Sequence, residues 1–247
     1  AKAEAEIAST PEFQRLEADL RAILDSDARI PGVKKIGNHY YNLWKDKKNP
    51  QGLWRRTTLE EYRKSEPRWE TVIDLDALNI AEKENWVWHG AECLKPQYER
   101  CLISLSRGGA DADVTREFDL VAKTWVQDGF FRPEAKGGLQ WIDADTVYVY
   151  TDFGKGSMTD SGYPRIVKRW QRGTPLAAAV TVFEGEAKDV AAHVDVDLTP
   201  GFERTLFSRA TDFYNNKLWL LQGLQGHRQV PIDKPGVFNF TREEPLG

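Results

Sequence analysis

The sequence is poor in the sulfur-containing and imidazole side chains that bind metals or carry out redox chemistry. Among 247 residues there are two Cys, four His and one Met. Cys93 and Cys101 have a spacing that fits neither a zinc pair nor a dithiol redox motif, so we expect reduced, structural thiols. The histidines are too far apart in sequence to form the i, i+4 pair of a zinc-binding helix. They are His39, His89, His193 and His227. We therefore expect no metal and no cofactor.

Long apolar runs and an excess of one charge are also absent. No stretch approaches the roughly 20 apolar residues that span a bilayer, which argues against a membrane protein. The 34 basic and 38 acidic residues give a formal charge of −4, so nucleic acid is not an expected partner. The first residues, Ala1 to Glu4, are polar and acidic, which predicts a cytoplasmic protein. A leader removed before Ala1 would instead place the protein in the periplasm.

Aromatic residues are abundant, with nine Trp, eight Tyr and eleven Phe. They suit strands that are packed on both faces. One amphipathic helix is predicted before them, over residues 10–26. Thr10 and Pro11 fit the N-cap and first helical position, and the apolar residues from Phe13 to Leu24 recur at helical spacing. Residues 25–37, with Pro31 and Gly32, then interrupt the pattern.

Short apolar runs recur after residue 38 and predict strands. One set comprises residues 70–75, 115–120, 165–170 and 217–221. The steps from Leu75 to Leu120, Trp170 and Leu220 are 45, 50 and 50 residues, which is a repeat. A more apolar set precedes each of these runs, at residues 40–44, 101–105, 146–150 and 205–207. Weaker strands are predicted at 84–88, 138–142 and 191–197.

A repeat of this length with about four strands is typical of a β-propeller blade. We therefore predict an all-β fold, a partial propeller of about four blades, preceded by the amphipathic helix. Residues 1–37 form the helical segment and residues 38–247 the incomplete propeller. The first blade is expected to be lengthened by an insertion at 47–68. A short apolar run at 236–240 is expected to begin a further structural element. A β-sandwich with irregular spacing is the alternative.

Several segments resemble the propeller part of the prolyl oligopeptidase family of serine peptidases. They are residues 52–62, 85–90, 104–111, 151–154 and 168–175. The resemblance covers nearly the whole chain, including the leading helix. It implies a helical segment, then a seven-bladed propeller of which about four blades are present. The C-terminal α/β-hydrolase domain, which carries a Ser-Asp-His triad in the family, would lie beyond Gly247.

The resemblance also implies a role. Propellers of this family cover the hydrolase active site, admit short peptides and exclude folded proteins. The chain is therefore expected to be the non-catalytic gate of a serine oligopeptidase. By itself the chain should be inactive. Its partners would be the hydrolase domain and a short peptide. An incomplete ring also exposes an unpaired face, so we expect the chain to self-associate.

No catalytic residue is predicted within the chain. A nucleophile elbow needs Gly-x-Ser-x-Gly, and Ser157, the nearest candidate, has Lys155 and Thr159 at the two glycine positions. We interpret this stretch as a propeller turn. Residues lining the substrate gate cannot be assigned from the sequence.

Two alternative functions depend on other side chains. A self-contained four-bladed propeller would bind carbohydrate or protein through Trp44, Trp54, Trp86, Trp88 and Trp141, although blade cores use tryptophan in the same way. A glycosidase or lactonase would use closely spaced acids, for which a turn or a solvated strand face is the simpler interpretation. These acids are Asp111 with Asp113, Asp143 with Asp145, and Asp195 and Asp197 near His193.

Overall fold

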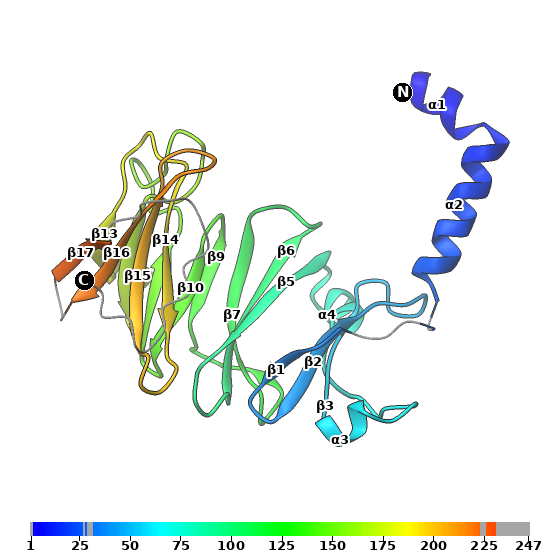
Figure 1. The fold of residues 1–247 in the computed structure, drawn as a ribbon, viewed down its shortest axis with the longest axis horizontal. Helices are drawn as coiled ribbons and strands as arrows, with labels where there is room; N and C mark the ends of the chain where they lie inside the picture. The colour runs from blue at the N-terminus through cyan, green and yellow to red at the C-terminus, as the bar shows by residue number, and fades with distance from the viewer. Residues whose placement is uncertain (1, 27, 29–31, 223–225, 231–247) are drawn as a thin grey trace. The chain divides into compact units, whose positions relative to one another are not determined.

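The fold is described by a computed structural model that covers residues 2–26, 28, 32–222 and 226–230 (Figure 1). The described strands form four antiparallel sheets. The chain divides into two compact units, Ala1–Trp86 and Val87–Gly247. No helix in the described ranges is both long and apolar enough to cross a membrane.

Two helices begin the first unit, α1 (Lys2–Ala8) and α2 (Pro11–Leu24). The predicted helix is confirmed as α2: the Thr10 hydroxyl oxygen accepts a hydrogen bond from the Phe13 N–H at 3.3 Å, and Pro11 opens the first turn. Helix α1 was not predicted. No side chain of α2 is buried, and the apolar face remains exposed, with Leu16 at 58% and Leu20 at 50%.

The first sheet contains β1 (Lys34–Ile36), β2 (His39–Trp44), β3 (Leu53–Thr57) and β4 (Glu70–Asp74), paired in chain order. Strand β3 lies in residues 47–68, so treating that whole segment as an insertion was wrong. Trp54 is buried against Tyr41, whereas the Arg55 guanidinium lies 4.2 Å from the Trp44 ring and 4.3 Å from the Trp69 ring. The two consecutive arginines at 55–56 interrupt the alternation of apolar and polar residues in the sequence, so this strand was not predicted.

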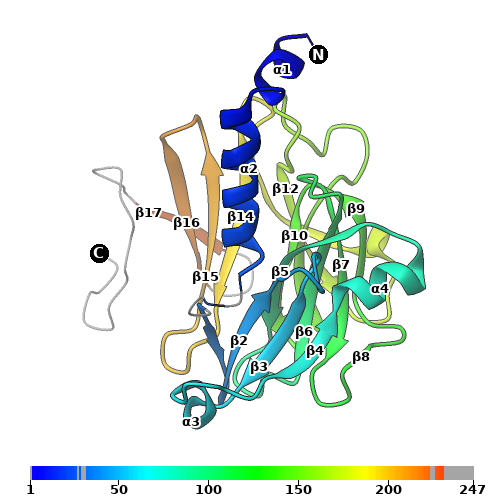
Figure 2. The same ribbon diagram turned by 90° about the vertical axis from the view of Figure 1, so that its right-hand side faces the viewer.

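Short helices complete the first unit. Helix α3 (Leu59–Tyr62) follows β3 directly (Figure 2). Helix α4 (Leu75–Glu82) was not predicted, because its first residue ends the apolar run of β4. The Asp74 carboxylate accepts the Ala77 N–H at 2.9 Å, and Lys83 takes the left-handed conformation with φ 55° at the other end.

The remaining sheets follow the predicted repeat. The second contains β5 (Trp86–Cys93), β6 (Arg100–Arg107), β7 (Asp113–Asp119), β8 (Thr124–Trp125) and β9 (Phe131–Ala135), with β9 paired to β7. The third contains β10 (Gly138–Asp143), β11 (Thr146–Tyr150), β12 (Ile166–Gln171) and β13 (Val180–Glu184). The fourth contains β14 (Ala191–Asp197), β15 (Arg204–Ala210), β16 (Asn216–Gln222) and β17 (Gly226–Val230). The predicted run at 236–240 lies outside the described residues.

The third sheet is buried on both faces. Successive side chains of a strand point to opposite faces. On β11, Val147 and Val149 belong to a core shared with Leu102 of the second sheet, and Tyr148 belongs to one shared with Phe207 of the fourth. A two-sheet sandwich has no central sheet of this kind. The described sheets therefore confirm a partial β-propeller.

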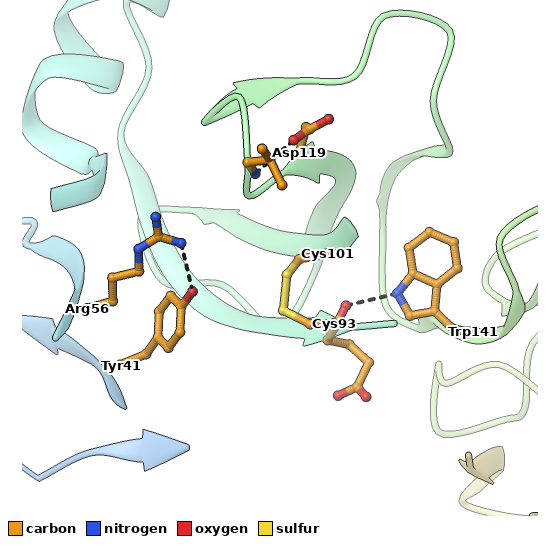
Figure 3. Close-up of a disulfide and its surroundings, with 8 residues drawn as sticks. Tyr41, Arg56, Cys93, Cys101, Asp119 and Trp141 are labelled. Carbon is orange, nitrogen blue, oxygen red and sulfur yellow. Dashed lines mark hydrogen bonds between the residues drawn. A yellow bond between two sulfur atoms is a disulfide. The ribbon is translucent and has the colours of Figure 1, made fainter. Parts of the chain in front are cut away.

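Cys93 and Cys101 form a disulfide, which corrects the expectation of reduced thiols (Figure 3). The Leu94 N–H donates to the Arg100 carbonyl at 2.9 Å. The next pair outward in an antiparallel ladder is a closely spaced pair without hydrogen bonds, which brings the two sulfurs together. A separation of eight residues fits a β-hairpin. Whether the two cysteines meet depends on the register of β5 and β6, which the sequence did not predict.

Candidate functional site

Ser157, the nearest match to a nucleophile frame, is a structural residue. Its side chain is buried in the connection between β11 and β12. The hydroxyl accepts the Phe153 N–H at 2.8 Å and donates to the Gly154 carbonyl at 2.6 Å. The hydroxyl is therefore committed to holding the turn, as the sequence interpretation expected.

The acidic pairs considered for metal or sugar chemistry do not form common sites. Asp111 is exposed and contacts Tyr163 and Lys136, whereas Asp113 is buried. Asp143 accepts the backbone N–H of Asp145 at 2.8 Å, as expected for an Asp in a turn. Within the described ranges, no group of three His, Cys, Asp or Glu side chains could hold a metal ion.

Most of the candidate tryptophans are core residues. Trp54, Trp86 and Trp141 are between 2% and 4% exposed, which leaves no ring face for stacking on a sugar. Trp44 and Trp88 are half-buried, and the Trp44 ring is already occupied by the Arg55 guanidinium. Three of the five candidate rings are therefore core residues, and a fourth is covered by a guanidinium.

The first strands of the three sheets in the second unit lie side by side. We call β5, β10 and β14 the first-strand row. The Trp141 indole N–H on β10 donates to the Glu92 carbonyl on β5 at 3.0 Å (Figure 3). The Lys95 ammonium, in the turn after β5, donates to Thr199 at 3.1 Å and lies 3.7 Å from Asp197 at the end of β14.

The first-strand row contains neither Lys nor Arg. Its ionisable side chains are two imidazoles and four carboxylates. They are His89, Glu92, Asp143, His193, Asp195 and Asp197. The three strands of the row therefore carry acidic and imidazole side chains, and the nearby Lys95 pairs with one of the carboxylates, Asp197.

A buried ion pair supports this row from within the second sheet. Arg132 on β9 is fully buried and donates to the Asp113 carboxylate on β7. The same guanidinium donates to the Thr115 hydroxyl at 3.0 Å and the Ala135 carbonyl at 2.8 Å. Burial lowers the pKa of Arg132, and the neighbouring Asp113 charge opposes that effect.

The second carboxylate oxygen of Asp113 reaches the first-strand row. It lies 3.1 Å from Nδ1 of His89, whose side chain is 28% exposed. The Thr115 hydroxyl continues the network to Ser104 on β6 at 3.1 Å. Four strands of one sheet therefore contribute to a single hydrogen-bonded chain that ends at His89.

His193 has a related arrangement in the fourth sheet. Its Nε2 lies 3.5 Å from the Asp195 carboxylate, and its ring packs edge-on against Tyr150 at 4.7 Å between centroids. Burial raises the pKa of the Tyr150 hydroxyl, with the Asp195 charge acting in the same direction. Tyr150 is therefore a neutral support for the imidazole.

Sequence reasoning missed this network. Arg132 received no role, and Asp113 was considered only beside Asp111. The one available signal was an arginine inside a strand-like run at 130–132, which snorkelling to the surface would equally explain. No nucleophile frame lies among the described residues.

Comparisons with known proteins agree with this picture. A family model described as the N-terminal β-propeller domain of prolyl oligopeptidase matches residues 4–237. An uncharacterized peptidase of Sinorhizobium fredii is 41% identical over 240 residues, covering 95% of this chain and 33% of that protein. An uncharacterized peptidase of Rickettsia prowazekii is 32% identical over 231 residues, covering 89% and 32%.

A solved structure is also similar. A post-proline cleaving enzyme from Rickettsia typhi superimposes with a TM-score of 0.84 at 29% identity, covering 95% of this chain and 36% of that one. The chain thus spans about a third of the length of the relatives that it matches.

Proposed function

Because the chain belongs to the prolyl oligopeptidase family as its N-terminal β-propeller domain, we propose that it is the non-catalytic gate of a longer serine peptidase. The gate admits short peptides to a C-terminal α/β-hydrolase domain and excludes folded proteins. We call the longer polypeptide the parent protein.

The observation that carries this proposal is the third sheet, which is buried on both faces. A steric filter must keep its shape, and close-packed sheets resist deformation. Val147, Val149, Val167 and Phe207 are each 0% exposed. The sheets of the second unit therefore supply a rigid wall, and the first-strand row gives one side of that wall a polar surface.

Helix α2 supports the second part of the proposal, a contact with the catalytic domain. An isolated helix of this length is marginal in water and is normally stabilised by packing its apolar face. That face of α2 has no partner among the described residues. We propose that the hydrolase domain of the parent protein covers it.

Activity assays on two proteins test the gate. The parent protein should cleave a chromogenic proline peptide, and should leave the same sequence intact when it is embedded in a folded protein. The present chain alone should cleave neither. The control is the parent protein with its predicted nucleophile, in a downstream Gly-x-Ser-x-Gly frame, changed to Ala.

Two results would overturn the proposal. One is turnover by the present chain that survives purification and is blocked by a serine-directed inhibitor. The other is cleavage of folded and unfolded substrates at the same rate by the parent protein.

A further inference from the structure

We propose that His89 is a peptide-binding residue of the gate, and that its outward ring nitrogen, Nε2, accepts a main-chain N–H of the short peptide. This inference rests on the proposed function and adds a binding group to it. It starts from the hydrogen-bonded chain that runs from Arg132 through Asp113 to His89.

The first step concerns the orientation of the imidazole. Arg132 is fully buried and its guanidinium donates to the Asp113 carboxylate, which fixes the position of that carboxylate. That carboxylate lies 3.1 Å from Nδ1 of His89. An ionised carboxylate accepts hydrogen bonds, so Nδ1 carries the proton that donates to it. In a neutral imidazole the other nitrogen, Nε2, is then an acceptor.

The second step concerns where Nε2 can find a partner. His89 lies on β5, the end strand of its sheet, and part of its side chain is exposed. Strands β10 and β14, next to β5 in the first-strand row, are also end strands of their sheets. The gate proposal places the peptide along the first-strand row, where the exposed part of the His89 side chain can contact it.

The third step concerns the class of ligand. A peptide offers one main-chain N–H at each residue other than proline. An acceptor nitrogen suits such a donor, and the strands of the row themselves contain neither Lys nor Arg that would offer a competing donor. His193 repeats the pairing of an imidazole with a carboxylate on β14. The ligand that His89 suits is therefore a main-chain N–H.

Two substitutions separate binding from structural support. Asparagine places a donor where Nδ1 of histidine lies, and glutamine places an amide near Nε2. In the parent protein, His89→Asn should keep the contact with Asp113 and raise KM for a proline hexapeptide roughly tenfold, which corresponds to one hydrogen bond. Its kcat and thermal midpoint should stay unchanged. His89→Gln should keep more of the affinity, and His39→Asn, in the other unit, should leave KM unchanged.

N-methylated peptides test the ligand group directly. Replacing one main-chain N–H at a time with N–CH₃ should raise KM for the wild-type protein strongly at one position. His89→Asn should show no additional loss at that position, because the acceptor is already gone. Equal losses in both proteins at every position would overturn the proposal.

A measurement on the wild-type protein covers the case in which His89 variants fail to fold. Diethyl pyrocarbonate acylates unprotonated imidazole nitrogens that solvent can reach. The non-cleavable reduced-amide analogue of the hexapeptide should lower labelling of His89 several-fold and leave that of His39 unchanged. Unchanged labelling of His89 would overturn the inference. If the parent protein selects substrates by size but its His89→Asn variant has the wild-type KM, this inference alone is refuted. If the wild-type parent protein shows no size selection, the gate itself is refuted.

Discussion

Arg132 is the residue whose environment differs most from what its side chain would have in water. It is 0% exposed, and its charge is balanced by Asp113. Removing one partner of a buried pair leaves the other charge buried without compensation, and this costs more than losing the attraction itself. A substitution that removes only one member of the Arg132–Asp113 pair should therefore lower the stability of the protein more than removal of both.

Changing Arg132 to Met should lower the free energy of unfolding of the chain by about 3–5 kcal/mol, because the buried Asp113 loses the guanidinium that balances its charge. The matched control is Arg107→Met. Arg107 pairs with Glu134 at 2.7 Å, but their side chains are 42% and 38% exposed. Such a pair contributes about 0–1 kcal/mol. Urea unfolding measures both values, and similar losses in the two variants would contradict the buried-pair argument.

Asp189 is a second buried carboxylate whose charge is balanced by an arginine. It lies in the connection between β13 and β14 and pairs with Arg209. Burial disfavours its charge, but hydrogen bonds from Arg209 and the Glu186 N–H outweigh that effect and keep its pKa below the usual range. A depressed pKa in the folded state means stability that is present at neutral pH and lost as the pH falls through that pKa. This pair therefore stabilises the protein at physiological pH.

At the scale of elements, α2 is a helix whose apolar side chains have no described partner. Its stripe consists of Phe13, Leu16, Leu20, Ile23 and Leu24, each at least 39% exposed. The stripe is the surface that we assign to the hydrolase domain of the parent protein.

Leu16→Asp combined with Leu20→Asp should detach α2 in the parent protein. Each leucine buried at the contact is worth about 1.5–3 kcal/mol, and a carboxylate reverses that gain. Limited proteolysis at the C-terminal end of α2 should then become faster. The control is Arg15→Asn, because the Arg15 side chain is 86% exposed and lies off the stripe. Unchanged proteolysis in the double variant would show that the stripe is not a contact.

Most elements could be predicted because their own periodicity is strong. The run at 146–150 coincides with β11, and those at 138–142 and 191–197 match β10 and β14 within a residue. The failures have local causes. Strand β3 carries two arginines that hide its alternation, and β5 begins at Trp86, two residues later than expected. Helix α4 follows β4 without any intervening turn residue.

At the scale of the molecule, the fourth sheet has one face on which the leucines are only half-buried. Phe207 is buried toward the third sheet, and Leu206 and Leu220 lie opposite each other on the other face. In a larger ring, a further blade would cover these leucines.

We expect the chain to self-associate through half-buried apolar surface of this kind. Light scattering after size exclusion, over a range of concentrations, should give a mass above the 28.2 kDa of the monomer that rises with concentration. Changing Leu220 to Lys should reduce the association, whereas Lys217→Arg, at an exposed position of the same strand, should not. A monodisperse monomer at every concentration would count against the incomplete ring.

The sequence by itself determined the class of the protein: strands in a repeating set, a leading amphipathic helix, and resemblance to a propeller of prolyl oligopeptidases. These follow from local periodicity and turn residues, which act over a few positions of the chain. Only the tertiary structure decided that Cys93 meets Cys101 and that Arg132 holds Asp113 against His89. Such contacts depend on which strands become neighbours and in what register, and that is set by packing between residues far apart in the sequence rather than by any short stretch of residues.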